Sequence, residues 1–419
     1  MNILYIAHRI PYPPNKGEKI RAFHQIRHLS KHHTVHLVCM VDDPADLTHI
    51  KTLEHYCSSV EAVYRSKSTM LLLGPLALLT SKPLSVISFY RGHLARKIAQ
   101  KLETEKFDRI FVSSSAMSEY VHHVSDIPKV IDFVDVDSDK WRMYAAHHSF
   151  PLSWIYRLEA KRLAKHEEKV ARLFDHSIFI SEEERRLFQQ RVNDGAISVV
   201  SNGVDLDYFK FSSEELPPAH SPIIVFTGVM DYFPNVDAVQ YFCQEIFPVV
   251  CEAVPETKFY IVGRNPTRHV KKLGHYPNVI VSGSVPDVRP YLAQATIAVA
   301  PFRIARGVQN KVLEAMATGL PVVGTSQAFK GIEATEHDGI RIADSPNRFA
   351  LQVISFLKGN LALRQQCGLQ ARRYVEDHHR WEDQGAKLES LLREPVRVFE
   401  GYKLVSVNRK GENILPTDF

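Results

Sequence analysis

The sequence has little cysteine, and the cysteines that it has are not paired. Its 419 residues include five, which are Cys39, Cys57, Cys243, Cys251 and Cys367. A zinc ribbon or a disulfide framework would need closely spaced pairs such as Cys-x-x-Cys, and none occurs. Scattered, unpaired thiols are typical of a reducing compartment, so we expect a cytoplasmic protein.

Apolar runs long enough to cross a bilayer are also missing. The most apolar stretch, Met70–Leu79, has about half of the ~20 residues that a spanning helix needs, and a Gly-Pro pair interrupts it. Two interpretations stay open: a core helix or packed loop, or a segment lying on a membrane surface with Lys67 and Lys82 at headgroup level. Ile3–Ala7 is too short for a secretory signal, and we expect a buried first strand there.

Several motifs of nucleotide and metal chemistry are absent as well. No Gly-x-Gly-x-x-Gly follows a predicted strand, and no P-loop sequence occurs. The run 135–139 resembles the start of a calcium loop, but Lys140 stands where the loop needs Gly and Ala146 where it needs a bidentate Glu. His24 and His28 share a helix face without the Glu of His-Glu-x-x-His. We therefore expect neither a resident metal nor a dinucleotide cofactor.

The overall composition is that of an ordinary globular protein, with 45% hydrophobic and 24% charged residues. This excludes collagen-like and wholly disordered chains. The net charge of +5 is mild for this length, and nucleic-acid binders concentrate more basic residues on one face. The excess suits an anionic small molecule or an anionic membrane surface instead.

Strand-like and helical segments alternate along the chain in two series, which predicts an α/β fold with two parallel sheets. The polar, proline-bearing stretch 212–218 separates the series as a linker. We therefore predict an N-terminal Rossmann-like domain over 1–211 and a second over 219–380. A helix over 381–394 is expected to pack back on the first domain, followed by a tail over 395–419. Ligands of such sheets bind at the carboxyl ends of the strands, so we expect a cleft between the domains.

The segment from Pro301 to Val323 has the features of an anion site. A strand ends at Pro301, and a loop with Arg303, Arg306 and Gly307 leads into a helix that begins near Lys311. Backbone N–H groups at a helix start attract phosphate oxygens, and glycine allows close backbone approach. Glu314 lies three residues after Lys311 on the same side of the helix, where its carboxylate suits ribose hydroxyls. The alternative is a Lys311–Glu314 salt bridge on a solvated helix.

The run Lys-x-x-Glu-Ala-Met-Ala-x-Gly-x-Pro-Val-Val in this segment resembles the signature of glycosyltransferase family 4, retaining enzymes of the GT-B fold. Asn202–Asp205 and Gly228–Ala238 resemble the end of that family's first domain and the opening of its second. Ile261–Gly263 and Val281–Val285 resemble the strand ends near its nucleotide base. Three further runs, at 17–21, 132–141 and 306–311, resemble the sugar transferases associated with exosortase (PEP-CTERM) and exopolysaccharide systems.

The resemblance implies a metal-independent transfer of a sugar with retention of configuration, from a nucleotide-sugar donor to a lipid-linked or polysaccharide acceptor. It also implies a protein that can contact the inner membrane peripherally and has no nucleic-acid partner. It implies a donor site made of Gly228, Gly263, Arg264, Val285, Arg303, Gly307, Gln309, Asn310, Lys311 and Glu314. It also implies an acceptor or phosphate loop made of Gly17, Glu18, Lys19 and Arg21.

The expected catalytic residues are Asp135, Lys311 and Arg306. Asp132 and Asp137 compete with Asp135 for the acid–base role, and a structural turn is an equal alternative. One departure is clear: many family members carry Glu-x7-Glu, and here Glu314 fits the second position while Arg306 occupies the first. This motivates a rival hypothesis, a degenerate module that binds nucleotide sugar without transferring it. A third hypothesis is a nucleotide-sugar epimerase, which would need paired acid–base residues that the sequence does not identify.

Overall fold

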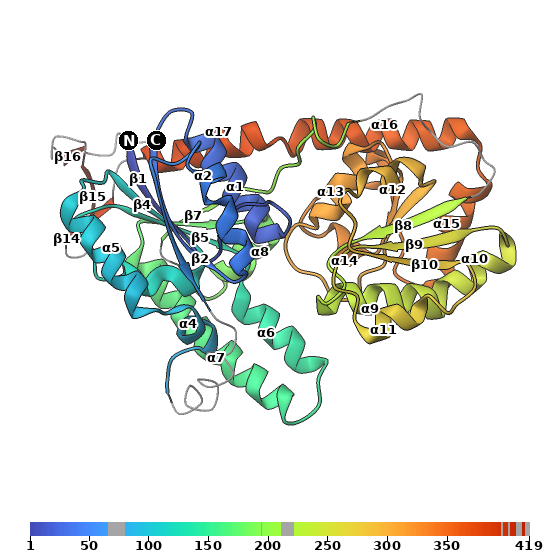
Figure 1. Cartoon of the computed structure of the whole chain (residues 1–419), viewed down its shortest axis with the longest axis horizontal. Helices are drawn as coiled ribbons and strands as arrows, with labels where there is room; N and C mark the ends of the chain where they lie inside the picture. Colours follow the sequence, from blue (N-terminus) through green and yellow to red (C-terminus); the bar gives the residue numbers. More distant parts are fainter. Residues whose placement is uncertain are drawn as a thin grey trace. The chain divides into compact units, whose positions relative to one another are not determined.

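The computed structural model describes residues 1–65, 80–193, 195–210 and 222–394, and the backbone of short strands at 397–400, 403–407 and 413–414. The chain forms two compact units (Figure 1). Unit 1 combines Met1–Val200 with Glu382–Phe419, and unit 2 is Ser201–Trp381. This boundary lies ahead of the linker predicted at 212–218. The whole of that linker, and the whole apolar stretch Met70–Leu79, fall outside the described residues.

Unit 1 is built on a seven-stranded sheet in which all neighbouring strands are parallel. Its central strands are runs of Val, Ile and Phe buried on both faces, as expected where helices cover both sides of a sheet. In sheet order the strands are β3 (Ser59–Tyr64), β2 (Thr34–Val41), β1 (Asn2–Ala7), β4 (Arg109–Ser113), β5 (Lys129–Val134), β6 (His176–Phe179) and β7 (Ala196–Val199).

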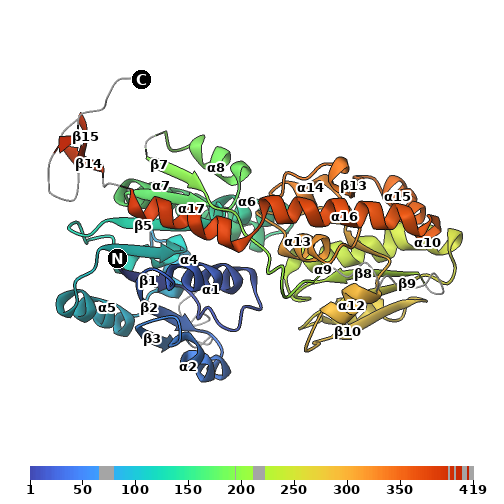
Figure 2. The same cartoon turned by 90° about the horizontal axis from the view of Figure 1, so that it is seen from above.

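Helices connect these strands. They are α1 (Gly17–Leu29), α2 (Ile50–Leu53), α4 (Leu84–Phe89), α5 (Gly92–Thr104), α6 (Asp137–Ala146), α7 (Leu152–Leu173) and α8 (Glu182–Gln189), with 3-10 turns at η1 (Pro44–His49) and η2 (Ser115–Tyr120). The last helix, α17 (Trp381–Arg393), lies beside α1 (Figures 1 and 2). Its Leu388 and Leu392 belong to the same buried cluster as Ile3 and Ile26. Glu389 binds His28 at 3.3 Å and His33 at 3.0 Å.

Unit 2 repeats the plan with a six-stranded parallel sheet. The strand order is β10 (Val279–Gly283), β9 (Lys258–Val262), β8 (Ile223–Thr227), β11 (Ile297–Ala300), β12 (Val322–Gly324) and β13 (Ile340–Ile342). The helical segments are α9 (Phe233–Tyr241), a π-turn η3 (Phe242–Ile246), α10 (Phe247–Ala253), α11 (Arg268–Leu273), α12 (Arg289–Gln294), α13 (Asn310–Ala317), α14 (Ser326–Phe329), η4 (Glu336–Asp338), α15 (Pro346–Lys358) and α16 (Leu361–His378).

The strand order of each sheet reverses beside its first strand, which places a topological switch point between β1 and β4 in unit 1 and between β8 and β11 in unit 2. Open α/β sheets bind ligands at the carboxyl ends of the strands at such points. In unit 2 those ends are Thr227 and Ala300. The fold therefore predicts a ligand site at the loops that follow these two residues.

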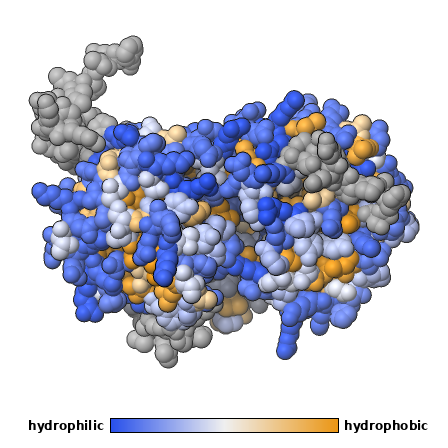
Figure 3. Space-filling view, turned by 45° about the horizontal axis from the view of Figure 1, so that its top comes forward, coloured by the Kyte–Doolittle hydropathy of each residue, from blue (hydrophilic) through white to orange (hydrophobic). Residues whose placement is uncertain are grey.

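Outside the two sheets, β14 (Arg397–Glu400), β15 (Lys403–Val407) and β16 (Asn413–Ile414) pair antiparallel. Within the described part of the chain, no helix combines the length and the apolar character that crossing a bilayer requires. On the face drawn in Figure 3, hydrophilic residues predominate and hydrophobic ones lie between them.

Candidate active site

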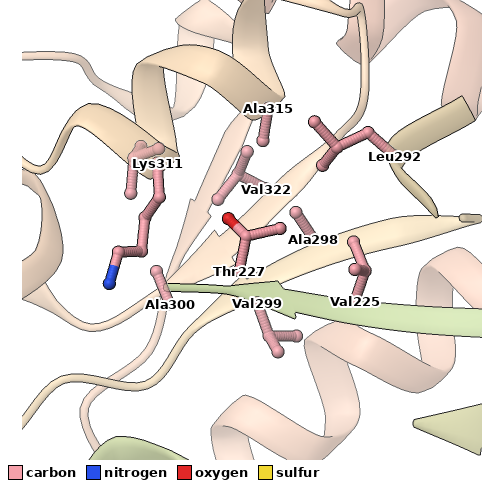
Figure 4. A pocket seen from close by; sticks show the side chains of 10 residues that line it. Val225, Thr227, Leu292, Ala298, Val299, Ala300, Lys311, Ala315 and Val322 are labelled. Carbon is pink, nitrogen blue, oxygen red and sulfur yellow. The ribbon is translucent and has the colours of Figure 1, made fainter. Parts of the chain in front are cut away.

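Lys311 lies in the first turn of α13, at the switch point of unit 2. Its stem lines a small, mostly apolar pocket together with Thr227, Ala300 and neighbouring aliphatic residues (Figure 4). Its ammonium group turns away from these aliphatic side chains and donates a hydrogen bond to the side-chain oxygen of Asn235. The same group lies 4.8 Å and 4.9 Å from the ring centres of Phe226 and Phe302, within the range of a cation–π interaction.

Asn235, on α9, is held so that its oxygen faces this ammonium. The residue is 3% exposed, and its side-chain NH₂ donates to the carbonyl of Val229 at 2.8 Å. The amide orientation is therefore defined, because only its oxygen remains to accept from Lys311. The consequence is electrostatic: a neutral amide fixes the ammonium in place without cancelling its charge.

Arg303, in contrast, is neutralised. Its guanidinium makes a two-pronged contact with the carboxylate of Asp237, at 2.5 Å and 3.1 Å, and lies 4.8 Å from the ring centre of Tyr241. The bond to Asp237 raises the pKa of Arg303. An anionic ligand would have to compete with this carboxylate, so the structure places Arg303 in an ion pair rather than open to a phosphate.

Glu314 follows Lys311 by one helical turn, and the two interact through their charges without a direct hydrogen bond in the described part of the chain. Burial raises the pKa of Glu314 to about 7, although the nearby ammonium of Lys311 opposes the shift. Burial also lowers the pKa of Lys311 to about 7, against the attraction of Glu314. Both side chains retain partial contact with solvent. The alternative of a solvated Lys311–Glu314 salt bridge is therefore not what the structure shows.

Two glycines bring the backbone close to Lys311. A Cβ atom at Gly228, directly after β8, would lie 2.9 Å from the ammonium nitrogen of Lys311 and 2.9 Å from the side-chain nitrogen of Asn235. Gly263 has a φ of +150°, and a Cβ there would lie 1.6 Å from the carbonyl oxygen of Gly228. The strand ends of β8 and β9 thus pack without side chains, which leaves the peptide of Gly228 beside the cation.

The loop before α13 carries the remaining predicted phosphate ligands. Gly307 has a φ of 60°, a left-handed conformation that glycine adopts readily. Gln309 occupies the N-cap position, but its side-chain NH₂ donates back to the carbonyl of Arg306 at 2.9 Å. The side-chain oxygen of Asn310 accepts a bond from Asn202 at 2.8 Å. The start of α13 is thereby tied to the turn that opens unit 2.

The other predicted donor residues lie farther along the edge of the sheet. The carbonyl of Arg264 accepts from the backbone N–H of Met230 at 2.8 Å, which links the loops after β8 and β9. Val285 follows β10, two strands from β8 in the sheet order. The structure therefore gathers Gly228, Gly263 and Lys311 at one point and places Val285 toward the rim.

In unit 1, the predicted acceptor loop separates into surface and interior residues. Gly17 begins α1 and is exposed, and Glu18 pairs with Arg9 at 3.3 Å. Burial raises the pKa of Glu18, but Arg9 and His8 outweigh this and the net shift is downward. Lys19 is 5% exposed and bound to Asp46 at 2.8 Å.

Arg21 points into the protein. It is 1% exposed, and its guanidinium binds Asp132 at 2.7 Å and 3.1 Å. Gln25 donates to the same carboxylate at 2.8 Å and accepts from the hydroxyl of Tyr5 at 2.6 Å. In this conformation Arg21 cannot meet an acceptor, and Asp132 is an internal counter-ion rather than a surface acid.

Asp135 lies just past β5, after a strained turn. Val134 has a φ of 67°, unusual for a β-branched residue, and the N–H of Asp135 donates to the carbonyl of Phe133 at 3.0 Å. Burial, followed by repulsion from Asp135, raises the pKa of Glu184 to about 8. Burial also raises the pKa of Asp137, against the opposing charge of Lys140. Acidic side chains therefore crowd this strand end.

Sequence reasoning missed two residues of these sites. Asn235 was part of a matched segment, but nothing in its spacing from Lys311 indicated contact. His8 follows β1 at the switch point of unit 1, and its Nδ1 is buried with no hydrogen-bond partner in the described part of the chain. Burial lowers the pKa of His8 to about 4. A His-Arg pair directly after the first predicted strand was the signal available for it.

Residues that could hold a metal do not gather in the described parts of the chain: no group of three or more His, Cys, Asp or Glu side chains has the required arrangement. Lys311 and the backbone N–H groups at the start of α13 carry positive charge in this part of unit 2.

Residues 221–359 match the family model described as "Glycosyl transferases group 1". Comparison with curated protein sequences gives no significant match. The match covers the strands and helices of unit 2 that carry Gly228, Asn235, Lys311 and Glu314.

Solved structures resemble nearly the whole chain. Sucrose-phosphate synthase from Thermosynechococcus elongatus superposes with a TM-score of 0.70 at 16% identity, over 94% of this chain and 98% of that one. Anabaena Alr3699/HepE in complex with UDP and glucose gives 0.66 at 15%, over 94% and 99%. WaaG, a glycosyltransferase involved in lipopolysaccharide biosynthesis, gives 0.63 at 16%, over 93% and 99%.

At these identities the structural likeness establishes the fold, and it confirms the predicted α/β class with two Rossmann-like units of GT-B type. The match of residues 221–359, which lie within unit 2, establishes the enzyme class. The protein is therefore a glycosyltransferase in class.

Proposed function

We propose that this protein transfers a sugar, with retention of configuration, from a nucleoside-diphosphate sugar to a lipid-linked or polysaccharide acceptor. The observation that carries the proposal is the ammonium of Lys311, held by a neutral partner beside the peptide of Gly228. A diphosphate leaving group develops negative charge as the glycosidic bond breaks, and a preorganised cation in a partly desolvated site stabilises that charge.

The donor would lie along the carboxyl edge of the unit 2 sheet. Lys311 and the first N–H groups of α13 would bind the diphosphate, and Gly228 and Gly307 would let it approach the backbone. Glu314 would accept hydrogen bonds from the ribose hydroxyls. Two similar structures hold UDP, one together with glucose, which supports a nucleoside diphosphate as the first ligand to test.

The chemistry needs no metal, because Lys311 and the helix start supply the positive charge that the leaving diphosphate requires. Arg306 would add charge at the loop, in place of the Glu that related sequences have there. On the acceptor side Asp135 is the candidate acid–base group, at the end of β5 among other carboxyl groups. Addition of a chelator is therefore expected to leave turnover unchanged.

The acceptor assignment follows from the family 4 resemblance. We propose an acceptor of the kind used in exopolysaccharide or other cell-surface glycan synthesis, glycosylated by a cytoplasmic enzyme that also contacts the membrane. The sugar-transferase subgroup associated with exosortase systems, which shares the runs 17–21, 132–141 and 306–311, remains our proposed place for this chain.

A binding module without transferase activity is the second candidate, and Arg306 is the observation that favours it. Purified protein would be incubated with UDP-, GDP- and TDP-sugars, with and without membrane extract, and released nucleoside diphosphate would be measured. Transfer predicts slow donor hydrolysis that membrane extract stimulates and that Lys311→Met abolishes. Saturable binding with no release under either condition would establish the binding module instead, and interconversion of donor sugars would indicate an epimerase.

A further inference from the structure

The hairpin formed by α6 and α7 in unit 1 has large apolar side chains at its tip. Three of them lie within five positions of one another: Phe150 is 80% exposed, Trp154 53% and Leu152 45%. Figure 1 shows the two helices side by side, extending from the strands of unit 1. Exposed aromatic residues that gather at one place, unlike single ones scattered on a surface, mark an interaction site.

The tip stands on a rigid base. The ring of Tyr156 lies 5.3 Å from that of Trp141, 6.3 Å from that of Tyr144 and 5.2 Å from that of His148, so that four rings pack together across the two helices. This cluster fixes the loop between α6 and α7. The exposure of Phe150 and Trp154 is thus a property of well-packed structure and does not result from a loosely held loop.

A stripe of positive charge continues from the tip along α7. Arg157, Lys161, Lys165, Lys169 and Arg172 are all exposed. Their spacing of four, four, four and three residues places them on one face of the helix, in line with Trp154 three residues earlier. We call Phe150, Leu152 and Trp154 the apolar tip, and the five basic residues the basic stripe.

Two of the three acidic residues of the same helix, Glu159 and Glu167, face the other way, whereas Glu168 is half-buried and lies on the side of the basic stripe. Glu159 is 1% exposed and accepts the backbone N–H groups of Leu84 and Ser85 at 2.6 Å and 2.9 Å, which caps α4. Glu167 is fully buried and accepts from the N–H of Ser138 at 2.9 Å, at the start of α6. These two carboxylates therefore do not neutralise the basic stripe, because they are used as internal caps. Glu168 offsets one of the five positive charges, and the stripe keeps a net positive charge.

We propose that the apolar tip and the basic stripe together form a docking surface for an anionic phospholipid bilayer. Aromatic and aliphatic side chains insert at the level of the headgroups, and lysine and arginine side chains beside them pair with the lipid phosphates. A second copy of this chain fits less well, because two basic stripes repel each other. This surface lies in unit 1, apart from the donor site in unit 2. The inference rests on the membrane contact of the proposed function, and its test does not measure sugar transfer.

The surface is distinct from Met70–Leu79, which the sequence offered as a membrane segment and which lies outside the described residues. That stretch combined apolar residues with two lysines in the linear sequence. The hairpin instead combines them in space, since its charges come from a single helix face and its apolar residues from the loop before it and the first turn.

The experiment is flotation of the full chain with vesicles of phosphatidylcholine mixed with phosphatidylglycerol, compared with vesicles of phosphatidylcholine alone. We expect binding to the mixed vesicles only. The tip variant Phe150→Ser/Trp154→Ser should lose roughly tenfold in affinity for each ring removed. The stripe variant Lys161→Gln/Lys165→Gln should lose about fivefold for each charge removed, and added salt should reproduce that loss.

Matched controls lie in unit 2. Leu351→Ser replaces an apolar side chain that is 64% exposed on α15, and Lys271→Gln/Lys272→Gln removes two exposed charges on α11. Both should float as the unaltered chain does. Trp154→Phe should keep binding but abolish the blue shift of tryptophan emission that vesicles cause, because Trp154 is the exposed indole at the tip. Thermal melts check that each variant is folded.

The proposal is overturned if the tip and stripe variants float like the unaltered chain, or if the unit 2 controls lose as much binding as they do. Equal binding to neutral vesicles would also overturn it. Concentration-dependent dimers that the tip variant abolishes, in a chain that does not float, would assign the surface to self-association. Binding of single-stranded RNA that depends on the stripe, again without flotation, would assign it to nucleic acid.

Discussion

The ammonium of Lys311 is hydrogen-bonded to the amide oxygen of Asn235, so a cation at the switch point of unit 2 is held by a neutral group. A short distance along the same helix, α9, the arrangement is reversed, because Asp237 neutralises Arg303. Of these two cations, Lys311 is therefore the one whose charge remains available to an anionic ligand. The proposed donor site depends on this asymmetry.

Replacement of Asn235 by Asp tests the importance of the neutral partner. A carboxylate at this position would pair with Lys311, and a diphosphate would then have to displace it. We expect Asn235→Asp to weaken UDP binding by about 1.5 kcal/mol, roughly tenfold, measured by isothermal titration calorimetry. Asp237→Asn is the matched control, because it releases Arg303 without touching Lys311. It should leave UDP affinity unchanged or raise it, and a loss equal to that of Asn235→Asp would contradict the assignment.

The affinity for UDP should fall as the pH rises. The pKa of Lys311 is lowered to about 7 by burial, so the ammonium loses its proton above that pH and with it the charge that binds the diphosphate. Glu314, whose pKa is raised to about 7, ionises over the same range. Its negative charge repels the diphosphate but strengthens its bond to the ribose hydroxyls, so we assign the decline to Lys311. Above about pH 7 the terminal phosphate of UDP is already ionised, so its charge stays constant.

The measurement is UDP affinity between about pH 7 and pH 9. Lys311→Arg keeps its charge throughout this range and should flatten most of the decline. Glu314→Gln removes the second titrating group, so the decline in UDP affinity that remains belongs to Lys311. A profile that is flat in the unaltered protein would show that the bound diphosphate does not depend on the protonation of Lys311.

Glu314 is predicted to recognise ribose and not phosphate. Glu314→Ala should weaken UDP binding by about 1.5–3 kcal/mol, the usual range for hydrogen bonds to a charged group. Inorganic pyrophosphate provides the contrast, since it has no ribose. Its affinity should stay the same or increase once the carboxylate is removed, and an equal loss for both ligands would contradict a ribose contact.

The sequence predicted the α/β class and the two parallel sheets because buried parallel strands are continuous apolar runs that alternate with amphipathic helices. It also singled out the segment with Lys311 and Glu314 as a candidate anion site. It could not predict that Lys311 contacts Asn235, because the two are 76 positions apart and meet only once β8 and β11 are neighbours.

The start of helix α6 is a second feature that the sequence did not predict correctly. The run Asp135–Asp139 suggested a failed calcium loop, whereas Asp137 and Asp139 lie in the first turn of a helix, where negative charge is favoured by the helix dipole. Likewise, the burial of Arg21 depends on a carboxylate on β5, far away in sequence. The sequence places an arginine near a loop, but only the folded structure shows which way its side chain points.

The contact between Gly263 and Gly228 should be intolerant of any side chain. A Cβ at Gly263 would overlap the carbonyl oxygen of Gly228, 1.6 Å away, so the strand ends would have to separate. We expect Gly263→Ala to lower the free energy of unfolding by about 3 kcal/mol or more, measured by denaturant titration. Gly283→Ala is the control: its φ is 71° but no atom lies within 4 Å of the added Cβ. It should cost about 1–2 kcal/mol, and equal losses would show that conformation, not overlap, decides the effect.

Arg21 and Asp132 form a buried ion pair whose loss should destabilise unit 1 without changing the reaction directly. Both side chains are almost completely buried, and Asp132→Ala would leave the guanidinium without its counter-ion, at a cost of about 3–5 kcal/mol. The double variant Arg21→Met/Asp132→Leu removes both charges and should recover most of that loss. Denaturant unfolding of the single and double variants gives the coupling between the two residues.

If Arg21 instead contacts the acceptor, as its place in the sequence suggested, Arg21→Met alone would raise the acceptor KM with little change in stability. A large coupling energy, together with an acceptor KM that stays constant in the folded double variant, would assign the pair to the core of the sheet.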